Sequence, residues 1–189
     1  MARPDGLGDQ SLRQIAAAVG SSHRMLLYHF GSKDGLLVAV AHAVEERTKT
    51  RLTDMISARG PASMELTDQN IVDMWALVAD PSQADFERLF FALYGRALQG
   101  DESIRPLLTD DIEHWLDANV ALTAPLGVPD DLARTHARLG LAVTRGLLLD
   151  LLATGDPAGV DAALEVFAAR YRGRWWDAQD ETGSSDRAS

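Results

Sequence analysis

The sequence predicts an all-α protein, and three of its features lead to that prediction. Apolar residues recur along most of the chain at the spacing of amphipathic helices. No segment alternates apolar and polar residues as a half-buried strand does, and no internal repeat is present. Glycine and proline residues interrupt the periodic segments at intervals that suit separate helices. A chain of 189 residues is long enough to bury a sizeable helical core.

The first predicted helix begins after Ser11, whose hydroxyl suits an N-cap. Gly20 ends this helix, because a residue without a Cβ adopts the left-handed backbone conformation most easily. Its apolar residues lie at i, i+3, i+4 and i+7 and form one stripe, which consists of Leu12, Ile15, Ala16 and Val19.

A second helix follows a Gly-Ser-Ser turn, with Ser22 as its N-cap. Leu26 and Phe30 are four residues apart and share its inner face. Its other side carries Arg24, Met25, Leu27 and Tyr28. Such cationic, phenolic and apolar groups contact phosphates, base edges and thymine methyl groups in a major groove. The pair of helices predicts a helix-turn-helix DNA-binding unit, although any two short amphipathic helices joined by a glycine turn share this pattern.

Residues 12–20, LRQIAAAVG, and residues 26–37, LLYHFGSKDGLL, resemble the DNA-binding segment of the TetR family of bacterial transcriptional regulators. That segment typically has the pattern L-x-x-IA-x-x-x-G, followed by LYxHF-x-SK-x-x-LL. The resemblance implies an all-helical homodimer with an N-terminal DNA-binding head and a larger body that binds a ligand and dimerises. We expect the head and its connecting helix at residues 1–58, the body at 59–176 and a disordered tail at 177–189.

Eight residues are candidates for DNA contact under this hypothesis. We expect five of them to face the groove, namely Arg24, Met25, Leu27, Tyr28 and His29. His23 would lie at the edge of the groove, and Arg13 and Lys33 would hold phosphates. Lys33 stands where the next helix begins, and free N–H groups at a helix N-terminus also bind phosphate.

The chain departs from the family pattern at two places. The family usually has a full helix before the one that begins at Ser11, whereas only MARPDGLGDQ, a poor helix former, precedes it here. Either the start is misplaced or truncated, or the head lacks its first helix and the inner face of the other two is uncovered. The second departure is Leu27, where family members commonly have a tyrosine that contacts phosphate. Leu27 cannot donate that hydrogen bond.

The charge of the chain is unevenly distributed. The formal net charge is -10, which by itself disfavours a polyanionic partner. Residues 11–51 nevertheless contain six cations and three acids, so this segment is +3 and the remainder of the chain is -13. We therefore expect DNA to be bound at one end only, with weak non-specific affinity and marked sensitivity to salt.

Beyond the head, apolar periodicity predicts a long connecting helix from residue 33 or 34 to about residue 58, and further helices over residues 68–79, 83–99, 104–122, 130–154 and from 157 onward. Ser82 with Asp85 is the expected cap of the helix over 83–99. Asp156 and Pro157 supply an N-cap and a first-turn proline for the last helix.

The last two helices are the most apolar, and the helix over 130–154 needs cover on nearly all sides. Pairing with a second copy of the chain would provide that cover, and the resemblance implies this arrangement. A purely intramolecular core is the alternative. The expected dimer interface consists of Leu139, Val143, Leu147, Leu151, Leu164, Phe167 and Tyr171.

Several side chains of the middle helices are candidates for lining an apolar ligand pocket, although a packed core explains them equally well. These are Trp75, Phe86, Phe90, Tyr94 and Trp115, with Arg96 and His114 as polar groups that would orient a ligand.

No catalytic residues, cofactor or metal site are expected. The chain has no cysteine and none of the common nucleotide-binding or hydrolase motifs. The cluster of Asp110, Asp111, Glu113 and His114 resembles a charged helix face more than a metal site. The longest nearly apolar run, residues 139–153, contains Arg145 and Asp150 and is too short to span a bilayer. We therefore expect a cytoplasmic protein without a membrane partner.

These observations predict a dimeric transcriptional regulator, specifically a repressor that binds a palindromic double-stranded DNA operator and is released by a small-molecule effector. A helical dimer with an incomplete head, which binds ligands or proteins but not DNA, is the alternative. A small helical enzyme that uses the acidic cluster around His114 is a third hypothesis.

Overall fold

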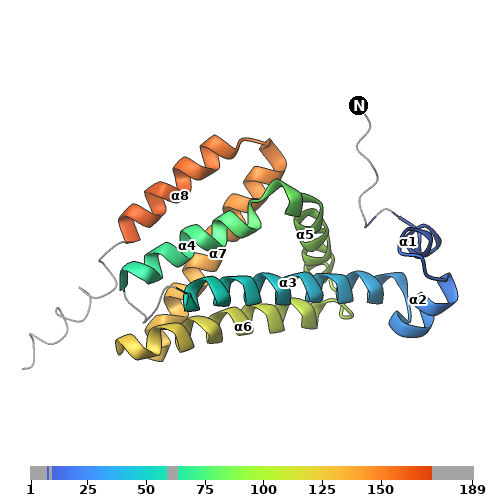
Figure 1. The fold of residues 1–189 in the computed structure, drawn as a ribbon, viewed down its shortest axis with the longest axis horizontal. Coiled ribbons are helices and arrows are strands. Elements are labelled where there is room, and N and C mark those ends of the chain that lie inside the picture. Colours follow the sequence, from blue (N-terminus) through green and yellow to red (C-terminus); the bar gives the residue numbers. More distant parts are fainter. Residues whose placement is uncertain (1–7, 9, 59–63, 172–189) are drawn as a thin grey trace, which may run out of the picture. The chain divides into compact units, whose positions relative to one another are not determined.

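The computed structural model describes residues 8, 10–58 and 64–171, without the side chains of residues 64–68, 70, 107, 111 and 171. The described part is helical and contains no strand. In chain order its elements are α1 (Leu12–Ala18), α2 (His23–Phe30), α3 (Lys33–Ser57), α4 (Met64–Val78), the 3-10 turn η1 (Pro81–Gln83), α5 (Ala84–Leu98), α6 (Arg105–Thr123), the 3-10 turn η2 (Ala124–Leu126), α7 (Asp130–Thr154) and α8 (Pro157–Tyr171) (Figure 1).

The described residues form two compact units. The first contains those up to Arg51 together with Val78–Trp115, and the second contains those of Leu52–Leu77 and those from Leu116 onward. The predicted boundary near residue 58 adjoins residues 59–63, which lie outside the described part. So do the segment before Ser11, apart from residues 8 and 10, and the expected tail at 177–189.

Helix α1 begins with a reciprocal capping box. The Ser11 hydroxyl accepts a hydrogen bond from the Gln14 backbone N–H at 3.3 Å, and the Ser11 backbone N–H donates to Gln14 Oε1 at 2.8 Å. Gly20 follows with a φ of 66°, as expected for the residue that ends the helix. The predicted stripe is wrong at Val19, which is 64% exposed. Val19 is the C-cap with a non-helical backbone, so it leaves the direction of the stripe.

A small core joins α1, α2 and the start of α3. It consists of the buried residues Ile15, Ala16, Leu26 and Leu36, with Leu12 and Val40 packed against it. The inner face predicted for α2 is confirmed at Leu26, whereas Phe30 at the end of that helix is exposed. Because Ile15, Ala16, Leu26 and Leu36 are each less than a tenth exposed, they hold α1 and α2 in a fixed arrangement.

The turn between α2 and α3 is tight. Gly31 has a φ of 71° and donates its N–H to the Leu27 carbonyl at 2.9 Å. The Ser32 hydroxyl then caps α3 by accepting from the Gly35 N–H at 2.9 Å. A Cβ on Gly35 would overlap the Phe30 carbonyl oxygen, so the two helices approach each other more closely there than any side chain would allow.

A second core in the same unit joins α3 to α5 and the start of α6. Its buried residues are Leu37, Ala41, Leu89, Phe90, Leu93, Ala97, Ile104 and Leu108. The expected cap of α5 by Ser82 is wrong, because Gln83 precedes this helix and makes no side-chain capping bond. Pro81 instead starts the 3-10 turn η1, in which Asp80 Oδ1 accepts from the Ser82 N–H at 2.7 Å.

In the second unit, α7 has the predicted bounds, and α8 contacts it after the turn at Gly155 (Figure 1). Asp156 caps α8 as expected, since its Oδ1 accepts from the Gly159 N–H at 3.1 Å. Trp75 of α4 donates its indole N–H to Asp161 Oδ1 on α8 at 2.7 Å. None of the helices in the described part of the chain combines the length and the apolar character needed to cross a bilayer.

Candidate nucleic-acid interface

Around its buried residue Leu26, α2 exposes the five residues predicted to face a DNA groove, and of these Arg24 and Tyr28 lie opposite Leu26. Arg24, Met25, Leu27, Tyr28 and His29 are all exposed, and Tyr28 is 81% exposed. The burial of Leu26 orients this helix, because a side chain two positions along from an inward-facing residue points to the opposite side. We call this exposed surface of α2 the recognition surface.

The aromatic rings of the recognition surface are in contact with one another. The Tyr28 and His29 rings meet edge to face, with their centroids 5.2 Å apart. The His29 and Phe30 rings are tilted, with centroids 6.3 Å apart. Three neighbouring exposed rings, those of Tyr28, His29 and Phe30, therefore lie in the C-terminal half of α2. Tyr28 and His29 also carry polar groups.

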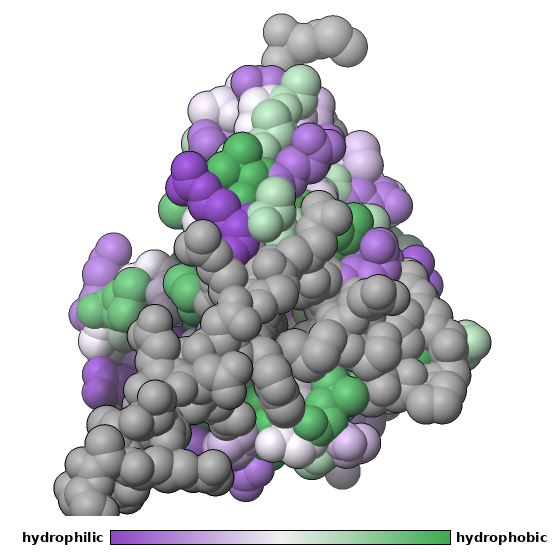
Figure 2. Space-filling view, turned by 90° about the vertical axis from the view of Figure 1, so that its left-hand side faces the viewer, coloured by the Kyte–Doolittle hydropathy of each residue, from purple (hydrophilic) through white to green (hydrophobic). Residues whose placement is uncertain are grey.

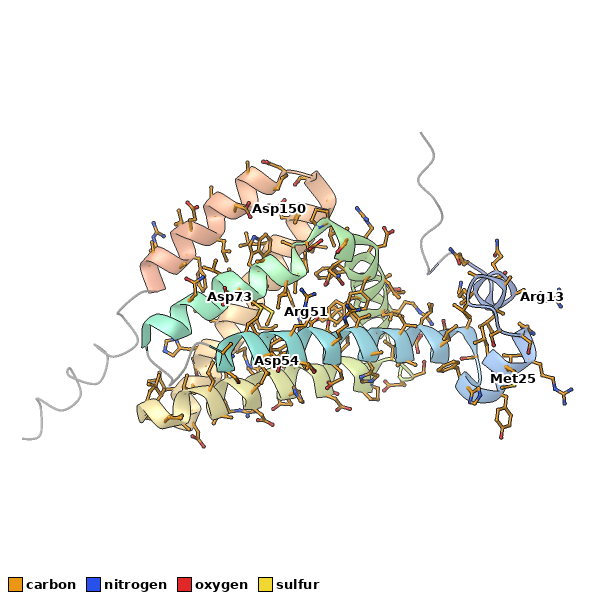
Figure 3. All side chains as sticks on the ribbon, in the orientation of Figure 1. Arg13, Met25, Arg51, Asp54, Asp73 and Asp150 are labelled. Atoms are coloured by element: carbon orange, nitrogen blue, oxygen red, sulfur yellow. The ribbon has the colours of Figure 1, made fainter. Side chains whose placement is uncertain are left out.

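The remaining candidates lie beside this surface. Arg13 on α1 is exposed, and its side chain projects from the same end of the first unit as that of Met25 (Figure 3). His23 is half-buried at the first position of α2. Lys33 is half-buried as well, and its Nζ donates to the Gly8 carbonyl at 2.5 Å. A phosphate at Lys33 would therefore compete with this backbone acceptor or share the ammonium group with it.

An ion-pair cluster next to this surface was not expected from the sequence. Arg96 of α5 donates two parallel hydrogen bonds to Asp34 at the start of α3, with distances of 2.8 Å and 2.9 Å. It also binds Asp101 at 2.7 Å. Hydrogen bonding and attraction from Arg96 hold the pKa of the Asp34 carboxyl below its usual value, and a hydrogen bond from Ser103, supported by Arg96, does the same for the pKa of Asp101. The sequence suggested Arg96 as a ligand-orienting group, but its guanidinium already binds two carboxylates.

The aromatic residues expected around a ligand lie in both units. Phe90 is buried on α5, with the Tyr94 ring 6.1 Å away and the Phe91 ring, which was not predicted, 5.7 Å away. Phe86 packs against the same core. Trp115 on α6 is buried and has the Lys49 ammonium 5.8 Å from its ring centroid. His114 is exposed. Trp75 belongs to the second unit and binds Asp161.

Among the described side chains, the acidic cluster on α6 does not form a metal-binding group. Asp110, Glu113 and His114 are exposed, and the side chain of Asp111 lies outside the described part. Among the side chains that the structure describes, no three His, Asp or Glu groups are close enough to hold a metal ion.

The predicted dimer-interface residues differ in exposure. Leu139 is exposed, Val143, Leu147, Leu151 and Phe167 are half-buried, and the Tyr171 side chain lies outside the described part. Leu164 is only 5% exposed, so it belongs to the interior of its own chain. Two apolar residues outside the predicted set are more accessible, Leu149 at 52% and Val166 at 53%.

These exposed residues follow one side of each helix. Along α7 they are Leu139, Ala142, Gly146, Leu149 and Ala153, and along α8 they are Ala162, Val166 and Ala169. Residues three to four apart share a helix face, so each row lies on one side of its own helix. We call the two rows together the α7–α8 face. On the side of the molecule seen in Figure 2, apolar residues lie in separate groups between hydrophilic ones, outside the residues drawn in grey.

Two family models match the chain. One is described as "Bacterial regulatory proteins, tetR family" and matches residues 5–40, and the other is described as "Tetracyclin repressor-like, C-terminal domain" and matches residues 66–170. The first match contains α1, α2 and the start of α3, and the second covers more than half of the chain. Both the recognition surface and the helical body are therefore parts of recognised family domains.

A similar protein and several similar structures are known. The HTH-type transcriptional regulatory protein RaaS of Mycobacterium tuberculosis is 28% identical over 163 residues, which cover 83% of this chain and 69% of that protein. A TetR transcriptional regulator from Legionella pneumophila has a TM-score of 0.65 at 19% identity, and covers 88% of each chain. A putative transcriptional regulator from Pseudomonas aeruginosa has a TM-score of 0.68 at 21% identity, over 93% of this chain and 83% of that one. At these identities the two structures establish the fold.

Proposed function

Because this chain belongs to the TetR family of bacterial regulatory proteins, we propose that it is a repressor that binds a palindromic operator as a homodimer and releases it when a small molecule occupies the body. The broader function, a ligand-responsive DNA-binding regulator of transcription, follows from the family and from its relatives.

The recognition surface is the observation that carries the proposal. An amphipathic surface helix normally presents charged and polar side chains to water. Here α2 exposes Met25, Leu27 and Tyr28 beside Arg24, while Leu26 anchors its other side. This combination suits a major groove, where a guanidinium binds guanine, a phenol binds base edges or phosphate, and apolar side chains contact thymine methyl groups.

The other predicted DNA contacts keep their proposed roles. His29 faces the groove with Tyr28, His23 lies at its edge, and Arg13 and Lys33 hold phosphates on either side. The Lys33 ammonium would bind phosphate near the start of α3 while α2 lies in the groove, since both belong to one rigid turn. The alternative of a helical dimer without DNA binding is not favoured, because it gives no reason for this exposed surface.

We also propose that the α7–α8 face forms the dimer interface. Leu139, Leu149 and Val166 are exposed apolar residues that a second copy would cover. Leu164 drops out of the interface predicted from the sequence, because it is already buried, and Leu149 and Val166 enter it. To bind adjacent major grooves of a palindromic site, the two recognition helices of such a dimer must lie about 34 Å apart. Such a protein acts in the cytoplasm, where bacterial chromosomal DNA is found.

For the effector, we propose an apolar small molecule bound among the aromatic residues of the first unit, Phe86, Phe90, Tyr94 and Trp115. Trp75 in the second unit is a separate candidate. Arg96 is not retained as a ligand-binding group, because Asp34 and Asp101 already accept three hydrogen bonds from its guanidinium.

Selection from a pool of random DNA duplexes tests this function directly. The purified chain should enrich an inverted repeat whose half-sites are about one helical turn apart, and footprinting on the enriched duplex should show two protected grooves on one face. The affinity for that duplex should fall steeply with salt, because phosphate contacts release counterions. A selection that enriches no sequence, although the chain is folded and dimeric, would contradict the proposal.

A further inference from the structure

The ion-pair cluster around Arg96 links two segments that are 62 residues apart in the chain. Both Arg96 Nη atoms bind Asp34, one to each carboxylate oxygen, and Nη2 also binds Asp101. A two-bond pairing of this kind fixes direction as well as distance, because the planar guanidinium and the planar carboxylate must be coplanar. One cation is thus shared between the first turn of α3 and the turn between α5 and α6.

The α5–α6 turn is itself rigidly held. The Asp101 N–H donates to the Arg96 carbonyl at 3.1 Å, and Asp101 Oδ1 accepts from the Ser103 N–H and hydroxyl at 3.2 Å and 2.6 Å. Buried Ala97 and Ile104 on either side of this turn belong to the core that contains Leu37 of α3. Arg96 therefore projects from a fixed support.

The other end of the cluster lies next to the tight turn that joins α3 to the recognition helix α2. Asp34 lies in the turn of α3 where Ser32 caps the Gly35 N–H, and the Ser32 N–H donates to the Phe30 carbonyl at 2.8 Å. A Cβ built on Gly35 would overlap the Phe30 carbonyl oxygen, so the end of α2 packs closely against the first turn of α3. A displacement of Asp34 would consequently move the C-terminal end of α2.

The side chains of the cluster are partly accessible to solvent. The side chains of Arg96, Asp34 and Asp101 are 40%, 47% and 27% exposed. Single ion pairs at such exposure contribute little to the free energy of unfolding, whereas a two-bond pair with a shared guanidinium contributes more and also fixes an orientation. What the geometry supplies is orientation, at the point where the recognition helix meets the rest of the first unit.

We propose that Arg96 is a positioning residue for DNA binding, which holds the first turn of α3, and through it α2, in the orientation that a specific operator requires. The inference rests on the DNA-binding function proposed above, but it concerns residues outside the recognition surface. Arg96 would act without touching DNA.

The key variant is Arg96→Lys, which keeps the positive charge but loses the planar fork. We expect it to weaken binding to the selected operator about three- to tenfold, while binding to a random duplex of the same length changes less than about twofold. Arg88→Gln and Arg96→Gln form a matched pair for comparison, since Arg88 lies on the same helix with the same 40% exposure, and its ion pair with Asp85 stays within α5. Arg88→Gln should bind the operator as the unaltered protein does.

A double-mutant cycle separates orientation from simple charge. If Asp34 only repels DNA and Arg96 neutralises it, Asp34→Asn should tighten operator binding. If the pair orients α2, then Asp34→Asn and Arg96→Gln should each weaken operator binding, and the double variant should be no weaker than the worse single variant. Tighter binding by Asp34→Asn would overturn the inference.

Hydrogen exchange provides a measurement that needs no DNA. In Arg96→Lys and Arg96→Gln, amides of residues 27–37 should exchange faster than in the unaltered protein, whereas Arg88→Gln should leave them unchanged. Unchanged exchange in this segment, or equal weakening of operator and random DNA, overturns the positioning role. If the unaltered chain selects no operator, the proposed function fails, and the exchange result alone then decides whether Arg96 orients α2.

Discussion

At the residue scale, Arg24 and Tyr28 are the side chains on which sequence-specific binding should depend most. Both are exposed on α2, and each can make hydrogen bonds to bases or phosphates. We predict that Arg24→Ala combined with Tyr28→Ala lowers the affinity for the selected operator at least about thirtyfold, because two contacts of roughly 1–3 kcal/mol each are lost. Fluorescence anisotropy with a labelled duplex measures this change.

The control for that prediction is Arg47→Ala, which removes an exposed cation from α3, outside both the recognition surface and the α7–α8 face. It should leave operator binding within about twofold of the unaltered protein, since it lies outside the recognition surface. Footprints that persist unchanged after the double substitution in α2 would show that another surface recognises DNA.

Periodicity correctly predicted that Leu26 of α2 faces inward, but it was wrong at Phe30 at the end of that helix, and it was insufficient for contacts between distant segments. Leu26 is buried and Tyr28 exposed because the side chains of a short helix point outward in a fixed angular order. The pairing of Arg96 with Asp34 depends on how α5 packs against α3, and no local pattern in the sequence contains that information. Arg96 was consequently interpreted as a ligand-binding group.

At the scale of the elements, caps were predictable where one residue decides the backbone conformation. Ser11, Ser22 and Asp156 cap their helices as expected, because a short polar side chain reaches the free N–H groups of the next turn. Ser82 was misassigned because Pro81 fixes its own φ and draws the chain into a 3-10 turn before α5 begins. The length of the 3-10 turn η1 depends on tertiary packing, which no local sequence pattern predicts.

The junction of α2 and α3 gives a prediction about stability. We expect Gly35→Ala to lower the free energy of unfolding by about 1–3 kcal/mol, because the new Cβ would overlap the Phe30 carbonyl oxygen and force backbone shifts. Operator binding should fall as well, since those shifts move α2. Urea denaturation followed by circular dichroism measures the stability.

A matched glycine shows whether the effect is steric. Gly95 lies within α5 of the same unit, and a Cβ there would meet nothing within 4 Å. Gly95→Ala should therefore stabilise the protein by up to about 1 kcal/mol through its better helix propensity. A Gly35 variant that is as stable as the Gly95 variant would disprove the close contact between the two helices.

At the scale of the whole molecule, the sequence predicted that α7 and α8 carry more apolar surface than one chain can bury. It did not predict which side of each helix is exposed. The helix over 130–154 is apolar nearly all round, so periodicity alone could not separate the side that packs inside the chain from the side that is left exposed. Leu164 was assigned to the interface and is buried, while Leu149 and Val166 were omitted and are exposed. Packing of α8 against α7 decides between them.

That exposed α7–α8 face leads to a prediction about assembly. Leu149→Asp together with Val166→Asp places two carboxylates on the face, and pairing two copies would then bury four charges without partners. We expect sedimentation velocity to show a dimer for the unaltered chain and a monomer for this variant at the same micromolar concentration. Binding to the palindromic operator should weaken by at least about a hundredfold, because a monomer engages one half-site without the gain of a tethered second contact.

Leu98→Asp is the appropriate control, since Leu98 is an exposed leucine on α5 in the other unit. This variant should remain dimeric and keep its affinity for the operator, which would show that added charge alone does not separate the copies. Thermal unfolding should confirm that each variant is folded, because all three positions are exposed and their substitution opens no cavity. A double variant that sediments as a dimer would place the interface elsewhere, and an unaltered chain that stays monomeric at high concentration would remove the basis for recognising a palindrome.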